Sequence, residues 1–150
     1  MSPKDAHYYF QPKILIRQII GKQFICAIDK SNAIADQSLY VAVPYAGSNV
    51  SLKLVLGILN SKLYGFYFRK FYSEEDDLFP KIKVNELKRL PFKFPDSKAE
   101  IKLIALVNKI IKEKEKSPTL NSIELENQID QLVYQLYDLT AEEIKIVEGV

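Results

Sequence analysis

The sequence is poor in the residues that build most catalytic and metal centres. Among its 150 residues there is one cysteine, Cys26, and one histidine, His7. One of each cannot assemble a zinc site, a Cys–His nucleophile pair or a serine triad with ordinary partners. The five glycines are scattered, so the chain has no glycine-rich phosphate-binding loop. These absences exclude the common nucleophilic, zinc-dependent and P-loop chemistries.

A single cysteine also excludes an intramolecular disulfide, and we therefore expect a reducing compartment. The first six residues carry charges and a proline where a secretory signal peptide needs an apolar core. No membrane-spanning segment is expected, because Lys53, Asn60, Lys62 and Arg69 interrupt the most hydrophobic stretch. The sequence predicts a cytoplasmic protein with no membrane partner.

What the chain has in quantity is apolar side chains, at 47% of all residues, and these can build a folded core. We expect an α+β domain over residues 1–95 and a helical tail over residues 96–150. Residues 1–95 hold 14 Lys and Arg against 8 Asp and Glu, a net of +6, whereas residues 96–150 hold 7 against 11, a net of −4. A basic body is typical of a domain that faces a polyanion, although acidic helices that follow basic strands would leave the same pattern.

The stretch Leu52–Phe92 organises the rest of the chain. Ser51 can cap a helix, and apolar residues follow it at three- and four-residue spacing on nearly all sides, which predicts one long buried helix. The helix ends in basic and aromatic residues at positions 69–72. After an acidic run, residues 79–84 could return as a strand, and Asn85 could cap one further helical turn.

Strand-like runs precede this helix. Residues 13–20 and 23–28 predict a hairpin with a two-residue turn at Gly21-Lys22, and residues 35–43, closed by Pro44, predict a third strand. A fourth strand could lie at an edge over His7–Phe10. The expected architecture is a small, mostly antiparallel sheet packed on the long helix.

The tail predicts helices. A capping box over Ser97–Glu100 opens the first helix, which should stop before Ser117-Pro118. A second helix begins near Asn121 or Ser122, and a capping box over Thr140–Glu143 opens a short third one. We expect a helical hairpin followed by a short terminal helix.

Basic residues interleaved with polar and aromatic ones are the positive candidates for function. Lysines on one face could follow phosphates, while Arg17, Gln18 and Gln37 carry donors and acceptors that can read base edges. A solvated surface role is the alternative for any single lysine. The basic candidates are Lys13, Arg17, Lys22, Arg69, Lys70, Lys81, Lys83, Lys88 and Arg89.

Two other classes of function stay open. Asp76 or Asp77 with Glu86 and Lys88 has the spacing of a magnesium-dependent nuclease, a short pattern that also arises by chance on solvated loops. Alternatively, the C-terminal helices could bind a partner helix, although such stripes are more often self-packed core. The apolar residues of that surface would be Ile101, Ile104, Val107, Leu132 and Leu136.

Five segments of the chain resemble one known family. In chain order they read PKILIRQI at 12–19, ADQSLYV at 35–41, LGILNSKL at 56–63, FPKIK at 79–83 and LKRLPF at 87–92. These segments are similar to the TaqI-like C-terminal specificity domain, the target-recognition part of adenine-specific DNA methyltransferases and of fused restriction–modification enzymes. The resemblance covers about residues 8–95 and is most specific at Leu-Asn-Ser-Lys-Leu and the later Leu-Pro, and residues 125–147 also resemble the tails of such enzymes.

The resemblance implies a module that binds double-stranded DNA and reads a short sequence from the major groove. On the matched motifs it implies contacts by Lys13, Arg17 and the turn Asp36–Ser38. The Asn-Pro-Pro-Tyr motif and the glycine-rich S-adenosylmethionine motif of the family's catalytic domains are absent from the sequence. We therefore expect no catalysis and no cofactor in this chain. S-adenosylmethionine and magnesium would belong to the methyltransferase and endonuclease domains of a parent enzyme, its expected partners besides DNA.

Overall fold

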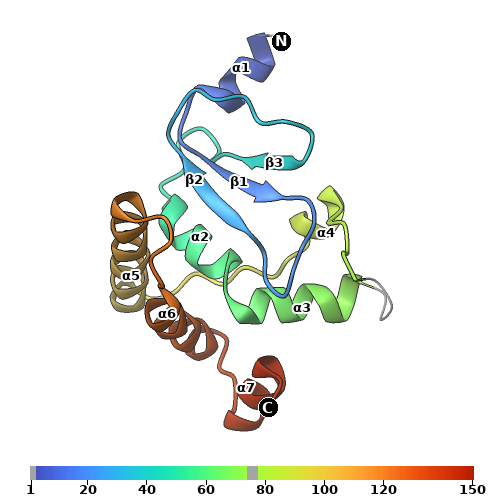
Figure 1. Ribbon diagram of the computed structural model, residues 1–150, viewed down its shortest axis with the longest axis vertical. Coiled ribbons are helices and arrows are strands. Elements are labelled where there is room, and N and C mark those ends of the chain that lie inside the picture. The colour runs from blue at the N-terminus through green and yellow to red at the C-terminus, as the bar shows by residue number, and fades with distance from the viewer. Residues whose placement is uncertain (1–2, 74–77) are drawn as a thin grey trace.

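The computed structural model describes residues 3–73 and 78–150 and has the α+β class that the sequence predicts (Figure 1). Three short strands lie near the middle of the molecule, with helices on one side of them and at both ends of the chain. In chain order the elements are α1 Pro3–Tyr9, β1 Lys13–Arg17, β2 Cys26–Asp29, β3 Leu39–Ala42, α2 Leu52–Leu59, α3 Lys62–Tyr72, α4 Val84–Lys88, α5 Ser97–Lys116, α6 Ile123–Leu136 and α7 Ala141–Glu148.

The sheet has the order β2-β1-β3, and both pairings are antiparallel. Ile16 of β1 lies opposite Cys26 on one side and Tyr40 on the other. Ile14 and Ile16 are buried against α2, so the alternate β1 residues, Arg17 among them, belong to the outer face. This alternation turns the polar end of β1 away from the core.

The predicted two-residue turn at Gly21-Lys22 is wrong. The strands of the hairpin are antiparallel neighbours as expected, but residues 18–25 connect them as a longer loop. The reason is a competing partner, because Ile82 N–H donates to Gln18 O at 2.7 Å and Ile20 N–H donates to Pro80 O at 3.1 Å. The loop then passes over α3 (Figure 1).

Other local predictions shift for similar reasons. The edge strand expected at His7–Phe10 is wrong, because these residues continue or follow α1, with Pro3 at its first position. Residues 79–84 form one isolated bridge, between Lys81 and Ile19, instead of a strand. The helical turn after them is α4, and its N-cap is Lys83 rather than Asn85.

The prediction of a single long helix is also wrong, because the helix is interrupted at Asn60-Ser61 and forms α2 and α3 instead. Ser51 caps α2 as predicted. Ser61 starts α3 in the same way, since its Oγ accepts a hydrogen bond from Tyr64 N–H and donates one to Ile58 O at 2.7 Å. α2 packs against the sheet, and α3 continues beneath the loop 18–25 (Figure 1).

The C-terminal helices follow the prediction closely. α5 ends before Ser117, but its N-cap is Asp96, whose Oδ1 accepts from Ala99 N–H at 2.8 Å, so the predicted box at Ser97 is one residue late. α6 begins after Ser122, and the capping box at Thr140 opens α7. In the part of the chain that the structure describes, no helix combines the length and apolar character that a bilayer crossing requires.

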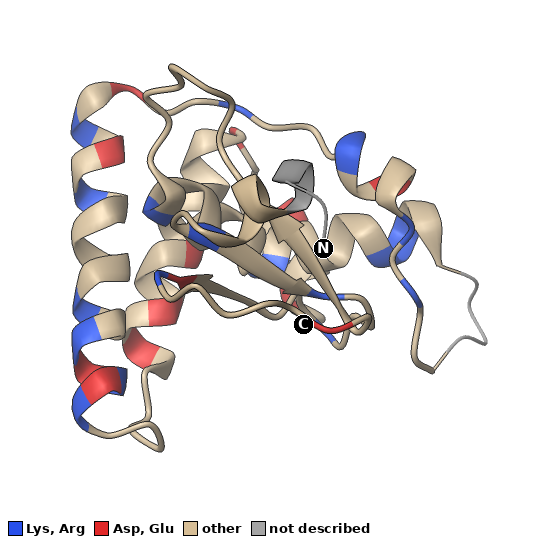
Figure 2. Cartoon of the chain, turned by 90° about the horizontal axis from the view of Figure 1, so that it is seen from above, with Lys and Arg blue, Asp and Glu red and all other residues tan. Residues whose placement is uncertain are grey.

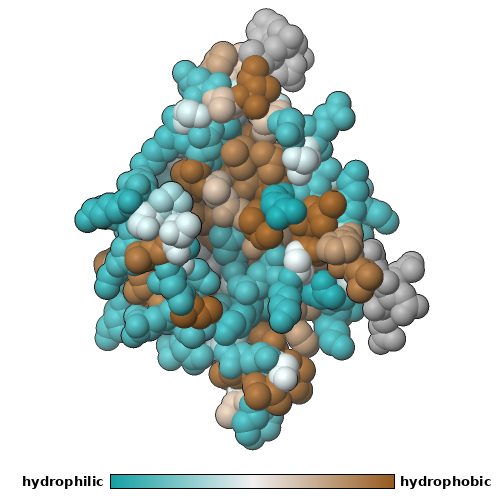
Figure 3. Space-filling view, viewed as in Figure 1, coloured by the Kyte–Doolittle hydropathy of each residue, from teal (hydrophilic) through white to brown (hydrophobic). Residues whose placement is uncertain are grey.

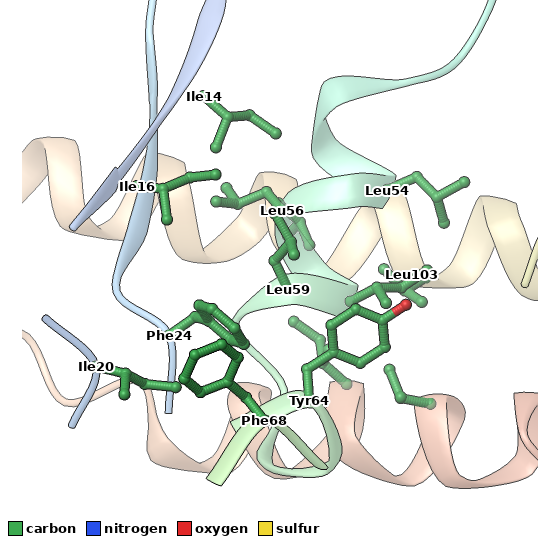
Figure 4. Packing of buried hydrophobic residues seen from close by; sticks show 14 of the residues in the cluster. Ile14, Ile16, Ile20, Phe24, Leu54, Leu56, Leu59, Tyr64, Phe68 and Leu103 are labelled. Carbon is green, nitrogen blue, oxygen red and sulfur yellow. The ribbon is translucent and has the colours of Figure 1, made fainter. Parts of the chain in front are cut away.

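One apolar core joins the sheet to the helices. Figure 4 shows Ile14 and Ile16 pointing toward Leu56 and Leu59 of α2, and Phe24 against Phe68. α5 and α6 add side chains to the same cluster, which places the stripe expected for a partner helix largely inside the protein. Val107 is buried, Ile104, Leu132 and Leu136 are partly buried, and Ile101 is 69% exposed. The domain boundary after Pro95 stays a prediction.

Candidate functional site

Three segments meet at the carboxyl end of β1. We call the side chains of Arg17, Gln18, the turn Asp36–Ser38 and Lys81 the strand-end cluster. Gln18 N–H donates to Ser38 O at 3.0 Å, while Gln18 O accepts from Ile82 N–H at 2.7 Å. The main chain of Gln18 therefore holds both the turn and the segment around Lys81 at the end of β1. Sequence positions far apart in the chain are brought together here by backbone hydrogen bonds.

The side chains of the strand-end cluster are presented to solvent. Arg17, Gln37 and Lys81 are exposed, and Gln18 is half-buried. Asp36 is turned into the loop, where its Oδ1 accepts from Ser38 N–H at 2.7 Å and from Ser38 Oγ. These hydrogen bonds, the one from Ser38 Oγ first, lower the pKa of Asp36 below its usual range. An ionised Asp36 thus shapes the turn and leaves Gln37 at its tip.

Lys83 lies beyond Lys81 on the same segment, which Tyr40 holds by donating from its hydroxyl to Ile82 O at 2.8 Å. The Lys83 side chain is 80% exposed, with its Nζ 4.0 Å from Glu86 Oε1. Glu86 Oε2 accepts from Lys83 N–H and so caps α4. Glu86 is therefore a structural residue, and among the described residues no three His, Cys, Asp or Glu side chains form a metal site. Asp76 and Asp77 of the nuclease hypothesis lie outside the described residues.

A second set of cations lies in a groove of about 660 Å³ between α3 and α7. We call it the α3–α7 groove. It brings Lys22, a candidate beside the predicted hairpin, together with Arg69 and Lys70, the candidates at the end of the predicted helix. Arg69 Nη1 donates to Gly21 O at 3.1 Å, which ties α3 to the loop that carries Lys22. The remaining lining residues are Gln23, Lys62, Phe66, Ser73, Val147, Glu148 and Gly149.

Lys13 is not with the other candidates, because its side chain is fully buried. Its Nζ lies 2.5 Å from Asp29 Oδ2 and donates to the carbonyl oxygens of Tyr9 and Ser31 at 3.0 and 2.8 Å. All three donors of the ammonium group are used inside the protein, so in this fold it cannot reach a phosphate. Lys13 instead joins α1 and the loop after β2 to the sheet.

Asp29→Asn should make unfolding less sensitive to acid. The hydrogen bonds to Asp29, from Lys13 first and then Ser31, lower its pKa to about 2. Because the folded-state pKa is the lower one, the stabilisation is complete above the unfolded value near 4 and is lost as the pH falls toward 2. Urea denaturation between pH 2 and pH 6 measures this, with Glu115→Gln as an exposed control. If the free energy of unfolding changes with pH equally in Asp29→Asn and in the unsubstituted chain, the lowered pKa of Asp29 does not contribute to stability as proposed.

The Leu-Asn-Ser-Lys-Leu motif has a structural role that its sequence did not reveal. Asn60 lies beside the edge strand β2, where its Oδ1 accepts from Cys26 N–H at 2.9 Å and its Nδ2 donates to Cys26 O at 3.0 Å. Lys62 N–H donates to the buried Asp130 of α6 at 2.9 Å. The motif thus joins the sheet, α3 and α6 at one point. The Asn-Ser pair was the available signal, since both residue types favour helix ends.

The surface around the two sets of cations differs from the rest of the molecule. Figure 2 shows Lys and Arg at the ends of α3 and α4, on the side of the molecule opposite α5. Along α5 itself, Lys alternates with Asp and Glu. Apolar side chains gather over the sheet and toward α4 on the face seen in Figure 3. Ile19 and Ile25, in the loop 18–25, are 43% and 47% exposed. Exposed apolar side chains of the loop 18–25 therefore follow directly after the charged and amide side chains of the strand-end cluster.

Comparison with known proteins agrees with the resemblance in the sequence. The family model of the TaqI-like C-terminal specificity domain matches residues 1–92. A protein of Methanocaldococcus jannaschii, RM.MjaORFECS2P, is 32% identical over 141 residues, and its name provisionally assigns it as a type II restriction enzyme and methyltransferase. That match covers 91% of this chain and 12% of the relative.

The fold has a solved counterpart. The type IIL restriction-modification enzyme MmeI, determined in complex with DNA, aligns with a TM-score of 0.71 at 12% identity. The alignment covers 93% of this chain and 22% of MmeI, so the chain spans a small part of both similar proteins. At that identity MmeI supports the fold. The family match over residues 1–92 shows that the chain belongs to the TaqI-like C-terminal specificity domains.

Proposed function

We propose that this chain is the DNA target-recognition part of a restriction–modification enzyme. The observation that carries the proposal is the strand-end cluster, which presents Arg17, Gln37 and Lys81 from three hydrogen-bonded segments at one end of the sheet. Arginine binds guanine O6 and N7 through two parallel donors, and glutamine pairs in the same way with adenine. A rigid backbone beneath such side chains lowers the entropy lost on binding.

The chemistry of the cluster suits the major groove of duplex DNA. Lys81 and Lys83 can contact phosphates and set the orientation of the domain, while Arg17 and Gln37 read base edges. Exposed apolar groups such as Ile19 can contact thymine methyl groups. Lys13 is left out of the proposal because its ammonium group is enclosed.

Methylation or cleavage would belong to other domains of a parent enzyme. This is consistent with the small share of each similar protein that the chain covers. S-adenosylmethionine and magnesium would be bound there, and this chain would supply specificity. The proposal therefore assigns duplex DNA and those catalytic domains as partners of the chain.

Arg17→Ala is expected to weaken binding to a preferred duplex by about 1–3 kcal/mol, or roughly 5- to 150-fold, with a smaller effect on unrelated duplexes. A preferred sequence is first selected from a randomised duplex library. Fluorescence anisotropy then measures the dissociation constants of the unsubstituted chain and of Arg17→Ala for this duplex and for unrelated duplexes. Binding should also weaken steeply as the salt concentration rises, because phosphate contacts release counterions.

Arg17→Lys is the matched control for charge, because it keeps one positive charge and loses the two-donor geometry. It should retain binding to unrelated duplexes and lose discrimination. If the unsubstituted chain selects no sequence from the library and its affinity for duplex DNA does not depend on salt, the proposed function is wrong.

A further inference from the structure

We propose that the α3–α7 groove is a second DNA contact, which holds the phosphate backbone beside the bases read by the strand-end cluster, and that Glu148 limits its strength. The inference rests on the proposed function. It separates two kinds of contact, one that gives affinity on any sequence and one that discriminates between sequences.

The charges in the groove favour a polyanion. Lys22, Arg69 and Lys70 are exposed around it, and none of them has a carboxylate partner among the ion pairs of the described residues. One N–H group of the Arg69 guanidinium donates to Gly21 O, which orients the group without neutralising it. Lys70 Nζ lies 6.0 Å from the centre of the Phe66 ring. Three cations, one of them oriented by a hydrogen bond, lie together in a groove whose lining includes an aromatic ring, and this favours anion binding.

Lys62 makes no net contribution to that surface. Its Nζ lies 3.6 Å from Glu148 Oε1 and 3.7 Å from Asp130 Oδ2, and it donates to Asn127 Oδ1 at 3.0 Å. The two carboxylates therefore compensate the lysine. The positive charge available to a ligand comes from the three other cations, and the two carboxylates exceed the charge of Lys62 by one formal negative charge.

The size and position of the groove favour a backbone over a single phosphate ion. A volume of about 660 Å³ is far more than one phosphate group fills. Lys22 follows Arg17 by five positions in the sequence, so their Cα atoms lie at most about 18 Å apart. One turn of duplex DNA is about 34 Å long. The distance between the groove and the strand-end cluster is therefore shorter than one turn of a duplex.

Among the described residues that line the groove, Glu148 is the acidic one. It is the last residue of α7, and its Oε1 accepts from Tyr134 Oη–H at 3.2 Å besides its approach to Lys62. These contacts hold a negative charge where phosphates would lie. Repulsion between Glu148 and the backbone would weaken every sequence equally, because it involves no base.

The experiment measures binding of the full chain to a short duplex of arbitrary sequence and to a preferred duplex, at several salt concentrations. The double variant Lys22→Gln and Lys70→Gln should bind both duplexes at least tenfold more weakly at low salt, with the slope of log affinity against log salt smaller by about 2. Arg69 is left unchanged because it also holds Gly21. The control is Lys109→Gln with Lys112→Gln, the same charge change on exposed positions of α5.

Glu148→Gln should bind both duplexes roughly threefold more tightly, since one screened repulsion is removed. Glu142→Gln, an exposed position on the same helix outside the groove, should leave binding unchanged. Circular dichroism and thermal unfolding check that each variant is folded.

The outcomes separate the groove from the strand-end cluster. One outcome is that the Lys22→Gln and Lys70→Gln double variant binds arbitrary DNA as tightly as the Lys109→Gln and Lys112→Gln control does. If it does, and Arg17→Ala still loses discrimination between sequences, the groove inference is wrong and the proposed function stands. A double variant that loses discrimination but keeps its affinity for arbitrary DNA also overturns the inference. If the unsubstituted chain binds neither duplex, both the proposed function and the groove inference are wrong.

Discussion

Gly65→Ala is expected to lower the free energy of unfolding by about 2 kcal/mol, although alanine is the better helix former. Gly65 is buried inside α3, directly under the loop 18–25. A Cβ atom at this position would lie 2.4 Å from Lys22 O and 2.7 Å from Gln23 Cα. Both neighbours are backbone atoms, so relief requires the whole loop to move away from α3.

Chemical denaturation followed by circular dichroism measures this effect. Gly21→Ala is the control, because a Cβ there meets nothing closer than Gln23 O at 4.0 Å, and it should change stability by less than about 0.5 kcal/mol. The sign is informative, since the same change at an exposed helix position would stabilise by up to about 1 kcal/mol. A stabilised Gly65→Ala variant would show that the loop does not rest on α3 as described. A displaced loop should also weaken DNA binding, because Lys22 would move with it.

Asn60→Asp is expected to destabilise the protein by about 2 kcal/mol at neutral pH, the cost of one lost hydrogen bond and an unpaired acceptor. A carboxylate can still accept from Cys26 N–H, which is 2.9 Å from Oδ1. It cannot donate to Cys26 O, which is 3.0 Å from Nδ2, and two oxygens would face each other there. The edge strand β2 would keep only one of the two hydrogen bonds that join Cys26 to the junction between α2 and α3.

The pH dependence makes this prediction specific. When the new carboxyl is protonated it regains one donor and can restore the second hydrogen bond, so part of the loss should reverse as the pH falls toward 4. Asn32→Asp, the same change at an exposed position, is the control. If Asn60→Asp and Asn32→Asp have equal, pH-independent effects, the paired hydrogen bonds to Cys26 do not contribute as proposed.

The Leu-Asn-Ser-Lys-Leu motif of the family joins parts of the structure that lie in different elements. The Asn60, Ser61 and Lys62 side chains bond to β2, to the end of α2 and to α6. None of these contacts lies within one secondary-structure element. A repeated apolar spacing predicts that the stretch is helical, but it carries no information about partners that approach from elsewhere in the chain.

The candidate site shows the same limit. Arg17 and Lys13 look alike in the sequence, as two basic residues on one strand. In the structure Arg17 is exposed at the strand end, whereas Lys13 is enclosed by Asp29 and two carbonyl groups. Lys62 and Glu148 were missed as groove residues because their pairing joins α3 to α7.

The sequence by itself determined the fold class, the positions of the C-terminal helices and the family, because these follow from apolar periodicity, capping residues and local motifs. Only the tertiary structure decided where the helix in Leu52–Tyr72 breaks, how far the β1–β2 loop extends, and which cations share a surface. The physical reason is that each of these depends on hydrogen bonds and close contacts between segments distant in sequence. Local propensity cannot set them, and competing long-range partners override the local turn and helix signals.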